Sequence, residues 1–154
     1  MRALYELPVG MKIEEMTGLE VLQAMALGEL PRASITTTIP MTFVKIEEGR
    51  VLFHAIANDS HLNPMGGVHG GFAATVLDSV TGCAVHTLLN AGVGYGTIDL
   101  NVKMIRTVPK NEKLIAEGKI INLSKSLGIS EGTLKSQDGK LLATATATCM
   151  IIKR

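Results

Sequence analysis

The feature that most constrains this chain is an apolar run from Phe72 to Leu89 that carries one carboxylate, Asp78, near its middle. Apolar residues fall on nearly every side of a helix built from this run, so the helix must be covered all round. An ionised carboxylate is almost never fully buried without a partner. The sequence therefore predicts a long buried helix over 70–89, with an acid that folding alone does not explain.

The segment before this helix is a glycine-rich turn, which reads Asn-Pro-Met-Gly-Gly-Val-His-Gly-Gly from Asn63 to Gly71. A helix start leaves backbone N–H groups free for an anion or a developing oxyanion. Gly70 and Gly71 have no side chains to block such an approach. The loop 58–69 is also long for a compact domain, which favours a functional role.

The rest of the chain predicts one short helix and a set of strands. Thr17 and Glu20 have capping-box spacing before an amphipathic helix at 18–28. Residues 34–39 are rich in β-branched side chains and therefore strand-prone. The strands expected after this segment are a hairpin of 43–46 with 50–57, then 97–104, 113–122, 127–135 and 141–152.

This order predicts an α+β fold, in which an antiparallel sheet wraps around one long central helix. The last strand places small residues on one face, where the helix can approach closely: Ala143, Ala145, Ala147 and Cys149. We expect a single domain over 1–154, with 1–30 as an N-terminal helical extension. Because one sheet covers only part of the helix, a second subunit is expected to cover the rest.

Composition excludes several kinds of partner. The net charge is +1 and 3% of the residues are aromatic, so no nucleic-acid surface is expected. The four histidines and two cysteines lack metal-binding spacings, so we expect no metal. Polar residues within the apolar run argue against a membrane span. No signal peptide is expected, because acidic residues interrupt the apolar N-terminal segment, and we expect a cytoplasmic protein; these residues are Glu6, Glu14, Glu15 and Glu20.

The glycine-rich turn at 63–71, followed by Asp78 eight residues after Gly70, resembles the hotdog-fold acyl-CoA thioesterases. The phenylacetic-acid-degradation branch is most similar, and the resemblance covers nearly the whole chain. It implies a sheet wrapped around a central helix, with subunits joined edge to edge as dimers or dimers of dimers. It also implies hydrolysis of acyl-CoA or aryl-acyl-CoA to the free acid and CoA, with no cofactor. A non-catalytic acyl-CoA-binding or regulatory module is the alternative.

The chemistry of thioester hydrolysis assigns roles to two groups. The Gly70 N–H can stabilise the oxyanion, and Asp78 can act as general base or as nucleophile. Eight residues of helix separate them by about 12 Å along the axis, which an aspartate side chain cannot span. We therefore expect an active site shared between two subunits, and the family pattern agrees.

Other positions are candidates of lower rank. Asn63 matches a family asparagine that positions the attacking water or the thioester, although an Asn-Pro turn explains it too. His69 and Gly71 border the thioester, and we favour a structural hydrogen-bonding role for His69. Thr97 aligns with a hydroxyl residue that some relatives place near the water, but threonine is ordinary at a strand start.

Two basic residues, Lys103 and Arg106, could contact the phosphates of CoA. A solvated strand edge explains them equally well. His86 lies about 12 Å beyond Asp78 on the helix, so it is a poor partner for a hydratase-type acid–base pair within one chain.

Overall fold

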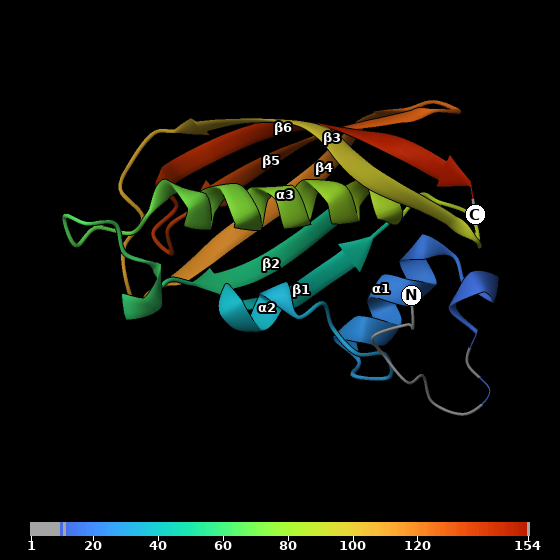
Figure 1. The fold of residues 1–154 in the computed structure, drawn as a ribbon, viewed down its shortest axis with the longest axis horizontal. Coiled ribbons are helices and arrows are strands. Elements are labelled where there is room, and N and C mark those ends of the chain that lie inside the picture. The colour runs from blue at the N-terminus through green and yellow to red at the C-terminus, as the bar shows by residue number, and fades with distance from the viewer. Residues whose placement is uncertain (1–9, 11, 154) are drawn as a thin grey trace.

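The computed structural model describes residues 10 and 12–153, and it shows a six-stranded antiparallel sheet curved around one long helix (Figure 1). The α+β class and the central helix are thus confirmed. Residues 1–9 of the predicted N-terminal extension, including Glu6, lie outside the described residues. The elements in chain order are η1 (Ile13–Glu15), α1 (Gly18–Ala26), α2 (Ile35–Thr38), β1 (Met41–Glu47), β2 (Arg50–Ile56), η2 (Asp59–His61), α3 (Gly70–His86), β3 (Val93–Met104), β4 (Lys113–Leu123), β5 (Leu127–Lys135) and β6 (Leu141–Lys153).

The sheet has the strand order β1-β2-β4-β5-β6-β3, and every neighbouring pair is antiparallel. β1 and β3 therefore form its two edges. β3 is twelve residues long and pairs with β6 on one side only. Its other side presents a row of backbone groups that a second chain could pair with.

α3 lies in the hollow of the sheet because the strands beneath it carry glycine and alanine there. A Cβ atom at Gly118 of β4 would lie 2.1 Å from the carbonyl oxygen of Val80, and one at Gly132 would lie 3.0 Å from Thr81 Cγ2. The Ser130 hydroxyl donates to the Thr81 carbonyl at 3.0 Å. The small residues predicted on the last strand are buried under the helix, as expected.

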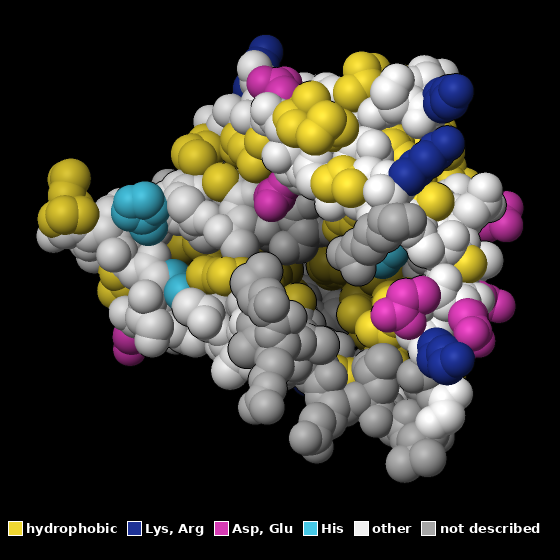
Figure 2. Space-filling model, turned by 45° about the vertical axis from the view of Figure 1, so that its right-hand side comes forward, with side chains coloured by type: hydrophobic (Ala, Val, Ile, Leu, Met, Phe, Trp, Pro, Cys, Tyr) yellow, Lys and Arg dark blue, Asp and Glu magenta, His cyan; other side chains and the backbone are white. Residues whose placement is uncertain are grey.

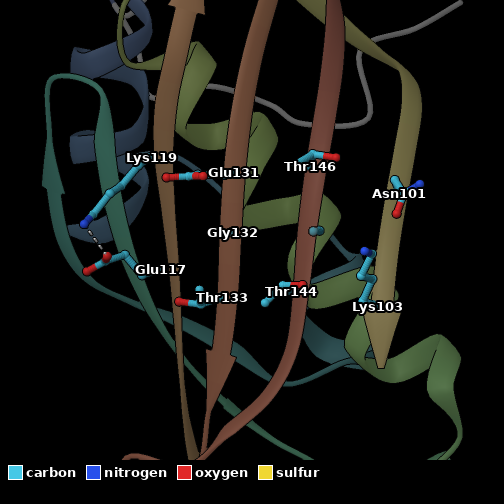
Figure 3. Close-up of a pocket in the computed structure, with 10 residues that line it drawn as sticks. Asn101, Lys103, Glu117, Lys119, Glu131, Gly132, Thr133, Thr144 and Thr146 are labelled. Carbon is cyan, nitrogen blue, oxygen red and sulfur yellow. Dashed lines mark ion pairs between the residues drawn. The ribbon is translucent and has the colours of Figure 1, made fainter. Parts of the chain in front are cut away.

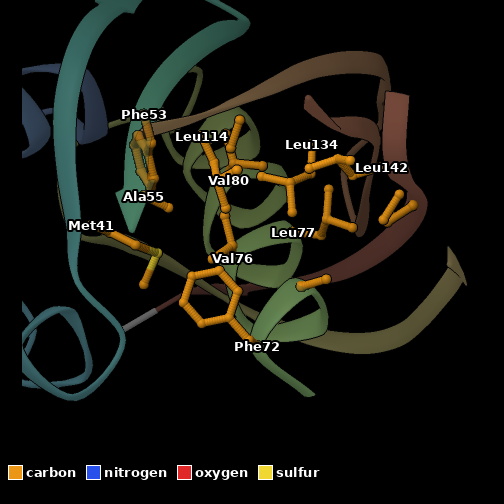
Figure 4. Packing of buried hydrophobic residues seen from close by; sticks show 14 of the residues in the cluster. Met41, Phe53, Ala55, Phe72, Val76, Leu77, Val80, Leu114, Leu134 and Leu142 are labelled. Atoms are coloured by element: carbon orange, nitrogen blue, oxygen red, sulfur yellow. The ribbon is translucent and has the colours of Figure 1, made fainter. Parts of the chain in front are cut away.

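The main core lies between α3 and the sheet, as Figure 4 shows. Val76, Leu77 and Val80 of α3 have no exposed surface and meet residues such as Leu114 and Leu134. The opposite side of α3 is only half-buried and recurs at helical spacing: Gly71, Ala74, Thr75, Asp78, Ser79, Cys83 and His86. We call these seven residues the open stripe of α3.

The N-terminal helix α1 begins with the predicted capping box. Thr17 N–H donates to Glu20 Oε2 at 2.8 Å, and Glu20 N–H donates to Thr17 Oγ1 at 3.2 Å. The predicted hairpin is confirmed as β1 and β2. Among the described residues, no helix combines the length and the apolar character that crossing a bilayer requires.

The strand expected at 34–39 is wrong, because this segment contains the short helix α2. Local hydrogen bonds stabilise the turn: the Thr36 hydroxyl donates to the Ala33 carbonyl at 2.7 Å, and Ile39 N–H donates to Ile35 O at 2.8 Å. Hydroxyl side chains that bond to nearby backbone compete with strand pairing. β-branching alone therefore predicted the wrong element.

α3 ends at His86, three residues before the predicted end. The Thr87 hydroxyl donates back to the Ala84 carbonyl at 2.7 Å and accepts the Gly49 N–H at 2.8 Å. These bonds fix the end of the helix to the β1–β2 turn.

The regular alternation of inward-facing and outward-facing side chains along β3 is interrupted by a bulge between Thr97 and Asp99. Tyr95 and Thr97 face α3 before it, whereas Leu100 and Val102 face α3 after it, opposite buried alanines of β6. A regular strand would place Ile98 on the same face as Leu100 and Val102, but Ile98 is 57% exposed. The bulge adds one residue and so reverses the facing of everything beyond it.

Replacing Gly118 with alanine should destabilise the protein by about 3 kcal/mol, because its Cβ would overlap the Val80 backbone. Gly96→Ala is the matched control, since a Cβ there meets only Ile152 Cδ1 at 3.7 Å. Urea unfolding of both variants measures the difference. Equal stabilities would contradict this account of how α3 is seated.

Candidate active site

The start of α3 leaves one backbone donor unused. His69 is the N-cap residue, and its Nδ1 accepts the Gly71 N–H at 2.8 Å. The Phe72 N–H donates to the His69 carbonyl at 3.0 Å. Within residues 12–153, the Gly70 N–H has no acceptor. It stands at the positive end of the helix dipole, where a negative oxygen would bind.

Asn63 fixes the loop that leads to this donor. Its Oδ1 accepts the N–H groups of Met65 and Gly67, at 2.9 and 3.2 Å. Its own N–H donates to the Gly67 carbonyl at 2.7 Å, and Gly66 adopts a φ of +85°. The amide oxygen is thus committed to the turn, and Nδ2 is the donor that remains for a substrate.

The free donor opens into a cavity of about 560 Å³ that we call the Gly70 pocket. Its lining includes Asn63, Met65, Gly70, Met104 and Arg106. Met104 lies directly over Gly70, since a Cβ on the glycine would be 2.5 Å from its Sδ. The Arg106 guanidinium donates to the Leu141 carbonyl at 2.7 Å, which holds it at this rim.

Asp78 lines a different cavity, of about 390 Å³, that we call the Asp78 pocket. Figure 2 shows hydrophobic side chains gathered around the hollows of the molecule. The Asp78 Oδ1 atom is buried and has no hydrogen-bond partner among the residues that the structure describes. The rest of the pocket is mainly apolar, and its lining includes Leu22, Met25, Arg32, Ile35, Phe43, Phe53, Ser79, Cys83, His86, Tyr95 and Thr97.

Two of the groups that line this pocket, the Cys83 thiol and the Tyr95 phenol, are uncharged at neutral pH. Burial raises the pKa of the Cys83 thiol to about 12, and the Asp78 charge adds to this effect. Burial likewise raises the pKa of the Tyr95 phenol well above its usual value. The Tyr95 ring lies against Gly82, where a Cβ would be 2.9 Å from its Cε2. Thr97 Oγ1 lies 3.8 Å from the Cys149 thiol.

The structure therefore divides the predicted site residues into three groups. Asn63, Gly70 and Arg106 share one pocket, and Asp78 and Thr97 share the other. Lys103 lies apart from both, on the face of the sheet that points away from α3 (Figure 3). It does not join Arg106, because it stands opposite the outward-facing Thr144 of β6.

Sequence reasoning missed most of the wall of the Asp78 pocket. Leu22, Ile35, Phe43 and Tyr95 come from four separate segments. Tyr95 stands between Gly94 and Gly96 at the start of β3. The pairing of β3 with β6 brings it over α3, and no local pattern signals that contact.

The raised pKa of Cys83 predicts that this thiol is inert in the folded protein, because its thiolate is scarcely populated at pH 8. Burial also raises the pKa of Cys149. A thiol reagent should label neither cysteine before unfolding and both in guanidinium chloride. Rapid labelling of Cys83 in the folded state would instead make it a candidate nucleophile beside Asp78.

Comparison with known proteins adds independent findings. The sequence model described as Thioesterase superfamily matches residues 65–143. A solved structure of a proposed thioesterase, a phenylacetic acid degradation-related protein from Ralstonia eutropha JMP134, is 33% identical. It superimposes with a TM-score of 0.77, and the match covers 83% of this chain and 97% of that one.

Two curated relatives are also similar in sequence. Human acyl-coenzyme A thioesterase 13 is 24% identical over 109 residues, which are 70% of this chain and 77% of that protein. A proposed esterase of Halobacterium salinarum is 40% identical over 68 residues. That match spans 43% of this chain and less than half of the relative, 44%.

Proposed function

The chain belongs to the thioesterase superfamily, as its sequence predicted, and on that premise we propose that it hydrolyses acyl-CoA or aryl-acyl-CoA to the free acid and CoA. The observation that carries the proposal is that α3 holds two polar groups without partners among the described residues. One is the buried, unpartnered Oδ1 of Asp78, and the other is the free N–H of Gly70. The name of the human relative supports CoA thioesters as the substrate class.

The two groups would act on one thioester only across a subunit interface. They line separate pockets of one chain and are about 12 Å apart along α3. A partner with its α3 antiparallel to this one would bring Gly70 of the partner subunit to Asp78. The open stripe of α3 is made of small and polar residues that permit such an approach, and the free edge of β3 could pair with its copy.

In the proposed reaction, the partner's Gly70 N–H donates a hydrogen bond to the carbonyl oxygen of the thioester. That bond stabilises the negative charge of the tetrahedral intermediate. Asp78 either removes a proton from the attacking water or attacks the carbonyl itself, and water then hydrolyses the resulting anhydride. The C–S bond breaks, and the thiolate of CoA leaves and takes up a proton.

The remaining candidates take supporting positions in this proposal. The free Nδ2 of Asn63 would orient the water or the carbonyl, and Thr97 would contact the water from the Asp78 side. His69 would hold Gly71 in place through their 2.8 Å hydrogen bond. Arg106 would contact CoA at the rim of the Gly70 pocket, and Lys103 would do so only in a larger assembly. The two free cysteines fit a reducing compartment, so we propose that the enzyme is cytoplasmic.

Gly70→Pro tests the oxyanion donor, because proline deletes its N–H and is well tolerated at the first position of a helix. His69 already has the extended ψ of 137° that a residue before proline requires. Gly70→Ala is the matched control, since it keeps the N–H and displaces Met104 to a similar degree. We expect kcat of the proline variant to be about 100-fold or more below that of the alanine variant. Equal kcat values would remove Gly70 from the mechanism.

Asp78→Asn should reduce thiol release from acyl-CoA by about 100-fold or more while CoA binding persists. Asp99→Asn is the control, because Asp99 is exposed on the outer face of β3. Mixing then tests the sharing of the site. A dimer of one Asp78→Asn chain and one Gly70→Pro chain should regain one working site, about half of the wild-type rate. Inactive mixed dimers would refute a shared site, and binding without turnover in the wild type would indicate a binding module.

A further inference from the structure

The most exposed large apolar side chain among the described residues is Met65, which is 96% exposed. It lies in the turn between Asn63 and Gly67. Hydrogen bonds to Asn63 hold that turn, and they use only the backbone N–H of Met65. Any residue with an N–H would satisfy the turn. The methionine side chain is therefore presented to solvent on a fixed support, and folding of one chain does not explain it.

Met65 lines the same pocket as Gly70. In any dimer that brings Gly70 of one chain to Asp78 of the other, Met65 of the first chain must therefore also come close to the second chain. Figure 1 shows the segment 62–69, coloured green, extending past the N-terminal end of α3. The turn thus projects along the helix axis, away from the body of its own chain.

The helix rise indicates where Met65 would arrive. If Asp78 faces the partner's Gly70 in an antiparallel pair, residues after Asp78 face the segment that precedes the partner's helix. Cys83 lies about 7.5 Å beyond Asp78 along α3. The projecting turn would come to the same level, where Cys83, His86 and Tyr95 line the Asp78 pocket.

We propose that Met65 of each protomer closes the Asp78 pocket of its partner, where the acyl group would bind, and that it selects acyl groups large enough to touch it. This inference rests on the proposed function and deepens it. A flexible thioether suits this role, because methionine adapts to ligands of different shape. The pocket lining offers it apolar surface, which includes Leu22 of α1 and Ile35 of α2.

The first experiment compares Met65→Ala with the wild type on acetyl-CoA, hexanoyl-CoA and phenylacetyl-CoA. We expect kcat/KM to fall about tenfold for the two larger substrates and less than about twofold for acetyl-CoA. Leu27→Ala is the control, because Leu27 is 74% exposed but lines neither pocket of the proposed site. An equal loss on all three substrates, or a loss no greater than that of the control, would overturn the proposal.

The second experiment shows which chain supplies the methionine. One chain carries Asp78→Ala with its natural Met65, and the other carries Met65→Ala with its natural Asp78. The one active carboxylate of this mixed dimer then belongs to the chain without the methionine. Acyl preference like the wild type supports closure by the partner, and preference like the Met65→Ala homodimer overturns it.

A binding measurement separates this inference from the proposed hydrolysis. S-hexyl-CoA, a thioether that cannot be hydrolysed, should bind Met65→Ala about tenfold more weakly than the wild type. If the wild type releases no thiol but this difference is found, the pocket inference stands and the hydrolysis proposal fails. If hydrolysis is found and the affinities are equal, the pocket inference fails alone.

Discussion

The close contact between α3 and the sheet is the constraint on which the rest of the structure depends. Gly118 leaves no room for even one methyl group beside the Val80 carbonyl, and Gly132 allows Thr81 to settle on β5. A helix seated this deeply buries its large aliphatic side chains on one side only. The open stripe, with Asp78 at its middle, is what the sheet fails to cover. The place of the acid is therefore a consequence of packing on the opposite side of the helix.

Asp78 makes this arrangement costly for a single chain. A buried carboxylate oxygen without a hydrogen bond loses hydration, and no described residue of its own chain replaces that hydration. The groups nearest to it, such as Cys83 and Tyr95, are held neutral by their own burial. The Asp78 carboxylate thus offers an unused oxygen to the Asp78 pocket, and the proposed reaction requires such a group as base or nucleophile.

Local chemistry explains which features the sequence could predict. The capping box at Thr17, the alternating small residues of β6 and the glycine turn before α3 each depend on neighbours within a few positions. The segment that forms α2 is predicted to be a strand because its residues are β-branched. β-branching does not reveal that the Thr36 hydroxyl bonds to the backbone and stabilises a helical turn. Lys103 and Arg106 are three residues apart but serve different surfaces. The walls of the Asp78 pocket come from distant segments, so only the folded chain reveals them.

The bulge divides β3 into two halves that line different pockets. Before it, odd-numbered residues such as Tyr95 and Thr97 line the cavity around the acid; after it, even-numbered residues face inward, down to Met104 above Gly70. The bulge thus changes, partway along the strand, which positions face inward. Deleting Ile98 would restore regular pleating and leave the inward residues of both halves in place, because Thr97 and Asp99 already stand opposite neighbouring residues of β6. A substitution at Thr97 would therefore reshape the Asp78 pocket, whereas one at Met104 would reshape the Gly70 pocket.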